Sequence, residues 1–119
     1  MQDILEMAGR LGKQVAADAR AQRLAKARTA FDGNVEARRL IDEYERQQNK
    51  VAELEMTGKP IEPVDKRRLM DLHQQVISSP VLKDLLKAQA DYVEMMALIS
   101  ERIEREALGS AAAVGPETS

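Results

Sequence analysis

The chain has 119 residues, enough for one domain, and its 18 basic and 20 acidic side chains give a net charge of −2. Because it has no cysteine, it can form neither a disulfide nor a thiolate metal site, and its near-neutral charge provides no general attraction for nucleic acid or anionic lipid. Only 3% of the residues are aromatic and 32% are charged, a composition typical of long helices and coiled coils.

The first segment, from about residue 2 to residue 31, has the spacing of an amphipathic helix. Its pattern loses phase between Asp18 and Ala21, so we expect a bend or a break there, and the spacing leaves open whether the segment is one helix or two. The apolar positions recur at steps of three and four residues, at Ile4, Leu5, Ala8, Leu11, Gly12, Val15 and Ala19.

A second helix is expected over residues 35–57, where apolar residues again follow helical spacing. Either Asp32 or Asn34 can cap its N-terminus, because both side chains accept hydrogen bonds from free backbone N–H groups. Gln47 and Gln48 interrupt the apolar seam. We therefore expect a narrow seam that contains a polar layer.

Gly58 is well placed to end the second helix. Pro60 and Pro63 then favour an extended connection, because proline lacks the N–H group and biases the preceding residue away from helix. A third, shorter helix is predicted over residues 64–77.

The last helix has the clearest start in the chain, since Ser79 suits the cap position and Pro80 the first helical position. We expect it to run to about Leu108 and to end at Gly109, with residues 109–119 as a disordered C-terminal tail. Its apolar residues follow a heptad pattern that predicts a coiled-coil-like partner: Leu82, Gln89, Met96 and Ile103, interleaved with Leu85, Tyr92 and Ile99.

These elements predict an all-α fold with one helical domain over residues 1–108. The expected architecture is a helical bundle with an N-terminal helix and a long antiparallel hairpin, formed by the helices at 35–57 and 80–108 with the short helix between them. Helices of this length carry an apolar seam along one side, and a single chain does not cover these seams. Self-association is therefore expected, as a homodimer or a higher oligomer.

The last helix is the predicted contact surface, for a second copy of the chain and for another protein. Met95 and Met96, with Met70, could form an adaptable docking surface, but core packing is the favoured interpretation. The predicted anchors of the interface are Leu82, Leu85, Tyr92, Met96 and Ile99.

The residues give no support to an enzyme or a bound cofactor. His73 is the only histidine, and a boundary or solvated position is favoured over a metal ligand. The carboxylates are interleaved with lysine and arginine, as on a solvated helix face. A carboxylate-metal enzyme is kept as an alternative, and it requires Asp and Glu side chains that converge inside the bundle.

The first 31 residues carry six basic and three acidic side chains, a net charge of +3. An RNA-binding adaptor is one interpretation. Pairing with the acidic faces of the second and fourth helices is favoured, because no aromatic residue interleaves the basic ones to stack bases. The possible basic patch consists of Arg10, Lys13, Arg20, Arg23 and Lys26.

The expected compartment is the cytoplasm. No apolar run approaches the roughly 20 residues that span a bilayer. The opening residues Met1, Gln2 and Asp3 lack the basic start and apolar centre of a signal peptide.

The order of several short motifs resembles the YlbF/YmcA family of small bacterial helical proteins, over about residues 3 to 109. An N-terminal Ile4-Leu5-x-x-Ala8 stretch leads into Leu11-Gly12, and a Leu69-x-x-Leu72 pair precedes the last helix, which ends at Leu108-Gly109. The turn reads Met56-Thr57-Gly58-Lys59-Pro60-Ile61, and the last helix begins Ser79-Pro80-Val81-Leu82-x-x-Leu85-x-x-Ala88-Gln89-x-x-Tyr92.

The resemblance implies an all-helical, cytoplasmic, oligomerising protein without known catalysis. Its best-described members are regulatory partners in competence, sporulation and biofilm development, acting with other proteins that include an RNA-degrading endonuclease. Iron–sulfur clusters reported for some members depend on cysteines, which are absent here. We therefore expect no such cluster in this chain.

Overall fold

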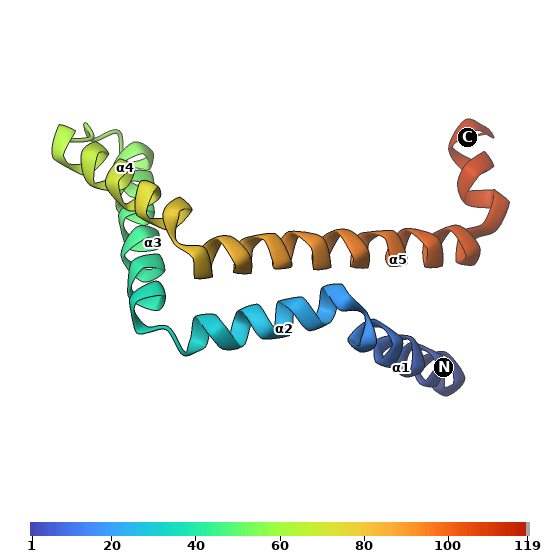
Figure 1. Ribbon diagram of the computed structural model, residues 1–119. Helices are drawn as coiled ribbons and strands as arrows, with labels where there is room; N and C mark the ends of the chain where they lie inside the picture. Colours follow the sequence, from blue (N-terminus) through green and yellow to red (C-terminus); the bar gives the residue numbers. More distant parts are fainter. Residues whose placement is uncertain (119) are drawn as a thin grey trace.

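The computed structural model describes the backbone of residues 1–118 and the side chains of residues 1–109. The helices are α1 (Gln2–Ala17), α2 (Ala19–Asp32), α3 (Val35–Met56), α4 (Pro63–Ser78) and α5 (Pro80–Thr118), arranged as Figure 1 shows. There is no strand among the described residues, so the all-α prediction is confirmed. None of the described helices combines the length and the apolarity that crossing a membrane requires.

The first segment is divided into two helices at Asp18. This residue has an extended backbone, with φ −71° and ψ 145°, and its Oδ1 accepts a hydrogen bond from the backbone N–H of Arg20 at 2.8 Å. The break predicted between residues 18 and 21 is thereby confirmed. Asn34 caps α3 in the same way, since its side chain accepts from the backbone N–H of Ala37 at 2.9 Å.

A Schellman motif centred on Gly58 ends α3. The φ of Gly58, 71°, is a left-handed conformation that glycine adopts without strain. The backbone N–H of Gly58 donates to Glu55 at 3.2 Å and that of Lys59 donates to Leu54 at 2.9 Å, which satisfies two free carbonyls of the last turn. At the other connection, Ser79 Oγ accepts from the backbone N–H of Leu82 at 3.4 Å, as expected for the start of α5.

Two antiparallel helix pairs make up the fold. α2 lies along the first half of α5, and α3 lies along α4, with the second pair crossing the end of the first (Figure 1). This pairing differs from the predicted hairpin of residues 35–57 with 80–108. The connections at 33–34 and at Ser79 turn the chain sharply at the same end of the α2–α5 pair, so α3 is carried away from α5 and contacts α4 instead.

The core consists of two small clusters. Leu24 and Ala27 of α2 pack against Leu85 and Ala88 of α5, and the second cluster joins α3, α4 and the start of α5 through Ala37, Val76 and Leu82. Phe31 is half-buried and contacts both clusters, so it links the two helix pairs.

Gly109 interrupts α5, with φ 57° and ψ −147°. The helix end predicted at Leu108–Gly109 coincides with this interruption. The predicted disordered tail, residues 109–119, lies largely outside the described part of the chain, which includes neither the side chains of residues 110–119 nor the backbone of residue 119. Its disorder therefore stays a prediction. The domain boundary at residue 108 stays a prediction as well.

Candidate protein-interaction surface

The five predicted anchors on α5 occupy two different environments. Leu82 is only 1% exposed and Leu85 is 9% exposed, so both belong to the core of a single chain. Tyr92 is half-buried against the α2–α5 cluster. Only Met96 and Ile99 lie past the last buried residue of α5, and both are half-buried. The first part of the predicted heptad seam is therefore covered by α2 of the same chain.

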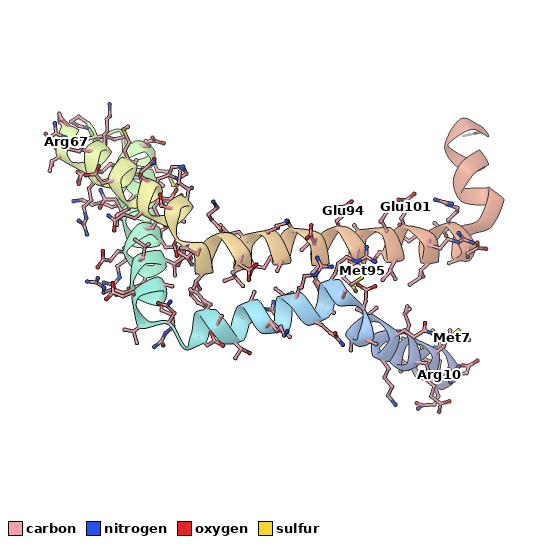
Figure 2. The ribbon with its side chains drawn as sticks, in the orientation of Figure 1. Met7, Arg10, Arg67, Glu94, Met95 and Glu101 are labelled. Atoms are coloured by element: carbon pink, nitrogen blue, oxygen red, sulfur yellow. The ribbon has the colours of Figure 1, made fainter. Side chains whose placement is uncertain are left out.

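Beyond Met95, which is buried, α5 continues past the end of α2. Two of its apolar side chains there are exposed, Leu98 at 57% and Ile103 at 53%, whereas Met96 and Ile99 are half-buried. Nearer the start of α5, one face of this helix packs on α2. Ile103 lies on the same face of α5, because helical spacing aligns it with Leu85 and Ile99. Figure 2 shows Met95 on the side of α5 that faces α2.

The methionines have separate roles. Met95 is buried in the core, which confirms core packing for this residue, whereas Met96 is half-buried and Met70 is 72% exposed on α4. They do not form one shared surface.

The apolar face of α1 is a second exposed surface, and it was not among the predicted contact sites. No residue of α1 is buried, and Ile4 and Leu5 are 63% and 55% exposed. Leu11 and Val15, nearer to α2, are half-buried. The signal for this surface was present in the sequence as the helical spacing of the apolar residues.

The whole chain is far more extended than its size requires. Its radius of gyration is 20.8 Å, whereas a compact domain of this length has about 13.5 Å. Its accessible surface is 9271 Å², whereas a compact monomer of this mass exposes about 6,450 Å². The excess is about 2,800 Å² for one chain, which is above the roughly 1,000–2,500 Å² that each partner contributes to an obligate dimer interface.

The predicted basic patch is divided between two helices and partly neutralised. Arg20 pairs with Asp18 at 2.9 Å, and Arg23 lies 4.0 Å from Asp91 of α5. Hydrogen bonds from Arg20 lower the pKa of Asp18 from 3.8 to about 2. Arg10, Lys13 and Lys26 are exposed and form no ion pair with a described residue. Arg10 lies near the middle of α1 (Figure 2).

A buried polar cluster fixes α3 against the start of α4. The amide nitrogen of Gln47 donates to the backbone carbonyl of Asp65 at 3.0 Å and to its carboxylate at 3.3 Å. Lys50 pairs with the same carboxylate at 3.0 Å, and these hydrogen bonds, first from Lys50 and then from Gln47, lower the pKa of Asp65. The predicted polar layer is present at Gln47, but the partner Asp65 was not anticipated.

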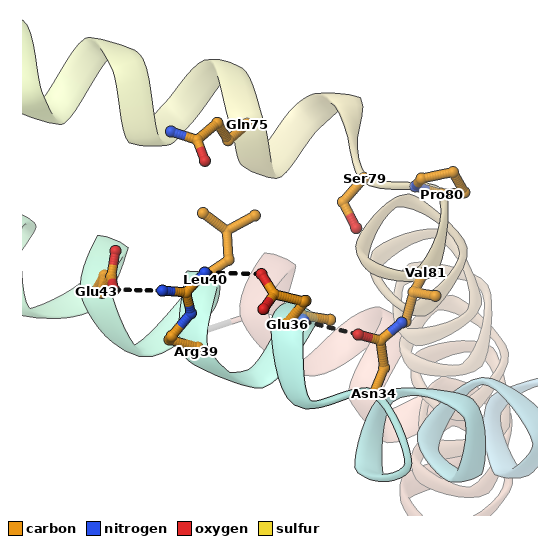
Figure 3. A pocket seen from close by; sticks show the side chains of 10 residues that line it. Asn34, Glu36, Arg39, Leu40, Glu43, Gln75, Ser79, Pro80 and Val81 are labelled. Atoms are coloured by element: carbon orange, nitrogen blue, oxygen red, sulfur yellow. Dashed lines mark hydrogen bonds and ion pairs between the residues drawn. The ribbon is translucent and has the colours of Figure 1, made fainter.

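A hollow of about 400 Å³ lies where α3, α4 and α5 meet (Figure 3). Arg39 pairs with Glu36 at 2.7 Å and lies 3.9 Å from Glu43, so the charged groups at its rim are already partnered. Leu40 and Val81 supply apolar walls. Both ion pairs lie within α3, so they neutralise the rim of the hollow and do not connect two helices.

His73 is exposed, and its Nδ1 lies 3.0 Å from the hydroxyl of Tyr44 on α3. This contact places it at the boundary of the α3–α4 pair, as expected. Within the described residues, no three His, Asp or Glu side chains converge as metal ligands would.

Comparisons with known proteins identify a family and a fold. Residues 4–106 match the family model described as "Control of competence regulator ComK, YlbF/YmcA". A solved structure titled "Protein of Unknown Function (DUF964) from Bacillus stearothermophilus" is similar with a TM-score of 0.63 and 17% identity, covering 92% of this chain and 96% of that one. At this identity the likeness concerns the fold alone. No curated protein sequence gives a significant match.

Proposed function

The chain belongs to the YlbF/YmcA family of competence regulators, and from this premise we propose that it is a non-catalytic regulatory protein that acts through helix-mediated contacts with other chains. Its partners are a second copy of itself and at least one different protein, in the cytoplasm, as the family resemblance implies.

One observation supports this proposal more than any other: Ile4 and Leu5 of α1 and Ile103 of α5 are 63%, 55% and 53% exposed on the apolar faces of their helices, in a chain that exposes 9271 Å². Large apolar side chains that are exposed together on one helix face, such as Ile4 and Leu5 of α1, are typical of interaction surfaces in soluble proteins. Association that covers these faces removes apolar area from water at about 25 cal/mol per Å². That gain is offset in part by the loss of translational and rotational freedom.

RNA binding is less well supported as the primary role. Arg20 and Arg23 lie beside Asp18 and Asp91, so two of the five basic residues face carboxylates. The remaining basic residues are distributed over diverging helices and have no aromatic residue between them to stack a base.

The experiment that tests the proposal is complementation in the native cell. Deletion of the gene is expected to change transcript abundances, and the wild-type chain restores them. A double variant, Leu5→Asp with Ile103→Asp, places charge on both uncovered apolar faces at positions that are 55% and 53% exposed. It is expected to fold but to fail in restoring the transcript profile.

The matched control is Lys13→Asp with Arg105→Asp. Both residues are exposed, and helical spacing places them on the opposite faces of α1 and α5. The lost ion pair of Arg105 with Glu101 is exposed and contributes little to stability. Full restoration by the Leu5→Asp, Ile103→Asp variant would contradict a role for these faces in regulation.

A further inference from the structure

We propose that two copies of this chain meet through an apolar stripe on the side of α5 away from α2, with their two α5 helices antiparallel. The stripe consists of Leu86, Ala90, Val93 and Ala97. This inference rests on the proposed function, because it names a second copy as the partner. It goes further by assigning the face, the orientation and the register of one contact.

The stripe is a second apolar face on a helix that already has one. Ala88 is buried against α2, whereas Leu86 and Val93 are 51% and 64% exposed. The stripe residues follow one another at steps of four, three and four, which is the spacing of a heptad seam. At about 100° per residue they lie together on the side of α5 opposite Ala88. A helix that is apolar on two sides is typically covered on both.

The charges beside the stripe indicate which partner fits. Lys83 and Lys87 lie along one side of the stripe near its start, by helical spacing. Glu94 and Glu101 lie along the same side toward its end, and Figure 2 shows both pointing away from α2. Neither lysine forms an ion pair with a described residue. This side is therefore basic at one end and acidic at the other, so a reversed copy of the same side complements it.

The orientation follows from this polarity. A two-fold axis perpendicular to the helices reverses one of them and brings the same side of each stripe together. Lysines of one copy then lie beside glutamates of the other. A parallel pair would instead bring the charged side against the uncharged side of the other copy, where Gln89 and Met96 lie, and would leave the four charges without partners.

The register follows from side-chain size. When Leu86 lies opposite Ala97 of the second copy, Ala90 lies opposite Val93, so each large side chain meets a small one. Small residues in these positions allow two helices to pack closely. The same register places Lys83 within one residue of Glu101 of the second copy, and Lys87 within two residues of Glu94, or about 3 Å along the helix.

A hollow at the start of α5 fits the same partner. It has a volume of about 700 Å³, lies between the end of α4 and the start of α5, and has Ile77, Leu86, Lys83 and Lys87 in its lining. In the proposed register it faces residues 96–104 of the second copy, whose stripe side carries Glu101. An apolar hollow with lysines thus meets an acidic helix segment.

Disulfide trapping tests the face and the register together, because the natural chain has no cysteine. In a Leu86→Cys, Ala97→Cys chain the two thiols are about 16 Å apart along one helix, too far to bridge within the chain. Mild oxidation is expected to give a covalent dimer, in several-fold higher yield than a matched Asp84→Cys, Leu98→Cys chain. The residues of this control are exposed on another side of α5.

The single variants test the orientation. Leu86→Cys alone, or Ala97→Cys alone, should give little cross-linked dimer, because an antiparallel pair separates the two identical thiols by about 16 Å. A dimer from Leu86→Cys alone would show a parallel pair and overturn the proposal. The proposal would also be overturned if the double variant kept its helical circular dichroism without forming the covalent dimer, or if the Asp84→Cys, Leu98→Cys control cross-linked equally well.

Charge reversal tests the ion pairs in the Leu86→Cys, Ala97→Cys chain. Lys83→Glu with Lys87→Glu should lower the yield of covalent dimer several-fold, because it places like charges beside each other. Adding Glu94→Lys and Glu101→Lys to the same chain should restore the yield. No loss in the first variant, or no recovery in the second, would contradict the charge complementarity that selects this register.

The outcomes separate this contact from the proposed function. A chain that fails to cross-link but restores the transcript profile in the native cell would overturn the contact alone. A chain that cross-links as expected, but whose deletion leaves transcript abundances unchanged, would overturn the proposed function and leave the contact standing.

Discussion

The side-chain amide of Gln47 on α3 donates to the backbone carbonyl of Asp65 on α4 at 3.0 Å, and both residues are less than 9% exposed. A buried polar group stabilises a fold when its partners are present and destabilises it strongly when they are removed. This contact therefore sets the register between α3 and the first turn of α4.

Replacing Gln47 by alanine is expected to destabilise the protein by about 1–3 kcal/mol, because the carbonyl and carboxylate of Asp65 lose a donor in a buried position. The neighbouring Gln48 is exposed, so Gln48→Ala is the matched control and should change stability by less than about 0.5 kcal/mol. Urea unfolding followed by circular dichroism measures both. Equal effects of the two substitutions would show that the buried cluster contributes nothing specific.

Stability is expected to fall in acid because two carboxylates have lowered pKa values. Arg20 lowers the pKa of Asp18 to about 2, and Lys50 and Gln47 lower that of Asp65. A carboxyl whose folded pKa lies below its unfolded value stabilises the fold above the unfolded pKa, and that contribution is lost as the pH falls through the folded pKa. The loss should therefore occur between about pH 5 and pH 2.

Thermal unfolding across this pH range provides the measurement. The Asp65→Asn variant should be less stable than the wild type at neutral pH and should show a shallower decline in acid. The control is Asp71→Asn, which removes an exposed carboxylate that forms no hydrogen bond or ion pair with a described residue. If the thermal stability of Asp65→Asn and of wild type declined equally steeply in acid, the assignment of this acid sensitivity to Asp65 would be contradicted.

Leu82→Ala is expected to cost about 2–5 kcal/mol of folding stability, because it leaves a cavity at a side chain that is 1% exposed. Leu86, on the next turn, is 51% exposed, so Leu86→Ala should change folding stability by less than about 0.5 kcal/mol. Denaturant unfolding of the two variants checks this. If Leu82→Ala weakened association without loss of folding stability, Leu82 would be an interface anchor and not a core residue.

The local elements could be predicted from sequence because each boundary depends on its own few residues. The phase change at Asp18, the glycine at 58 and the Ser79-Pro80 start all act through backbone hydrogen bonds within one helical turn. The structure places helix boundaries at or next to these positions.

The helix pairing could not be predicted in the same way. Leu24 and Ala27 form one apolar stripe, and Leu40 and Tyr44 form another with similar spacing. The spacing does not show which of the two stripes faces α5. Two tight connections decide the pairing, and their directions depend on backbone angles that the pattern does not encode. For the same reason the sequence pattern predicts Leu82 and Leu85 to be interface residues, although α2 and the α3–α4 pair cover them.

RNA binding is expected to be weak and insensitive to the basic residues of α1. Binding through phosphate contacts would fall steeply with salt concentration, because each contact releases condensed counterions. Filter binding at two salt concentrations should show little difference between wild type and a Lys13→Glu variant, with Lys59→Glu as the control outside α1 and α2. Tight binding that is lost with salt and abolished by Lys13→Glu alone would favour the RNA-adaptor interpretation.

The central claim is that a second copy covers the apolar faces of α1 and of α5 beyond Met95. Light scattering coupled to size exclusion, over a dilution series, tests it most directly. The account predicts a folded particle of at least twice the 13.3 kDa chain mass, which dissociates in the Leu5→Asp, Ile103→Asp variant. A folded wild-type chain that stays at 13.3 kDa at every concentration would contradict it.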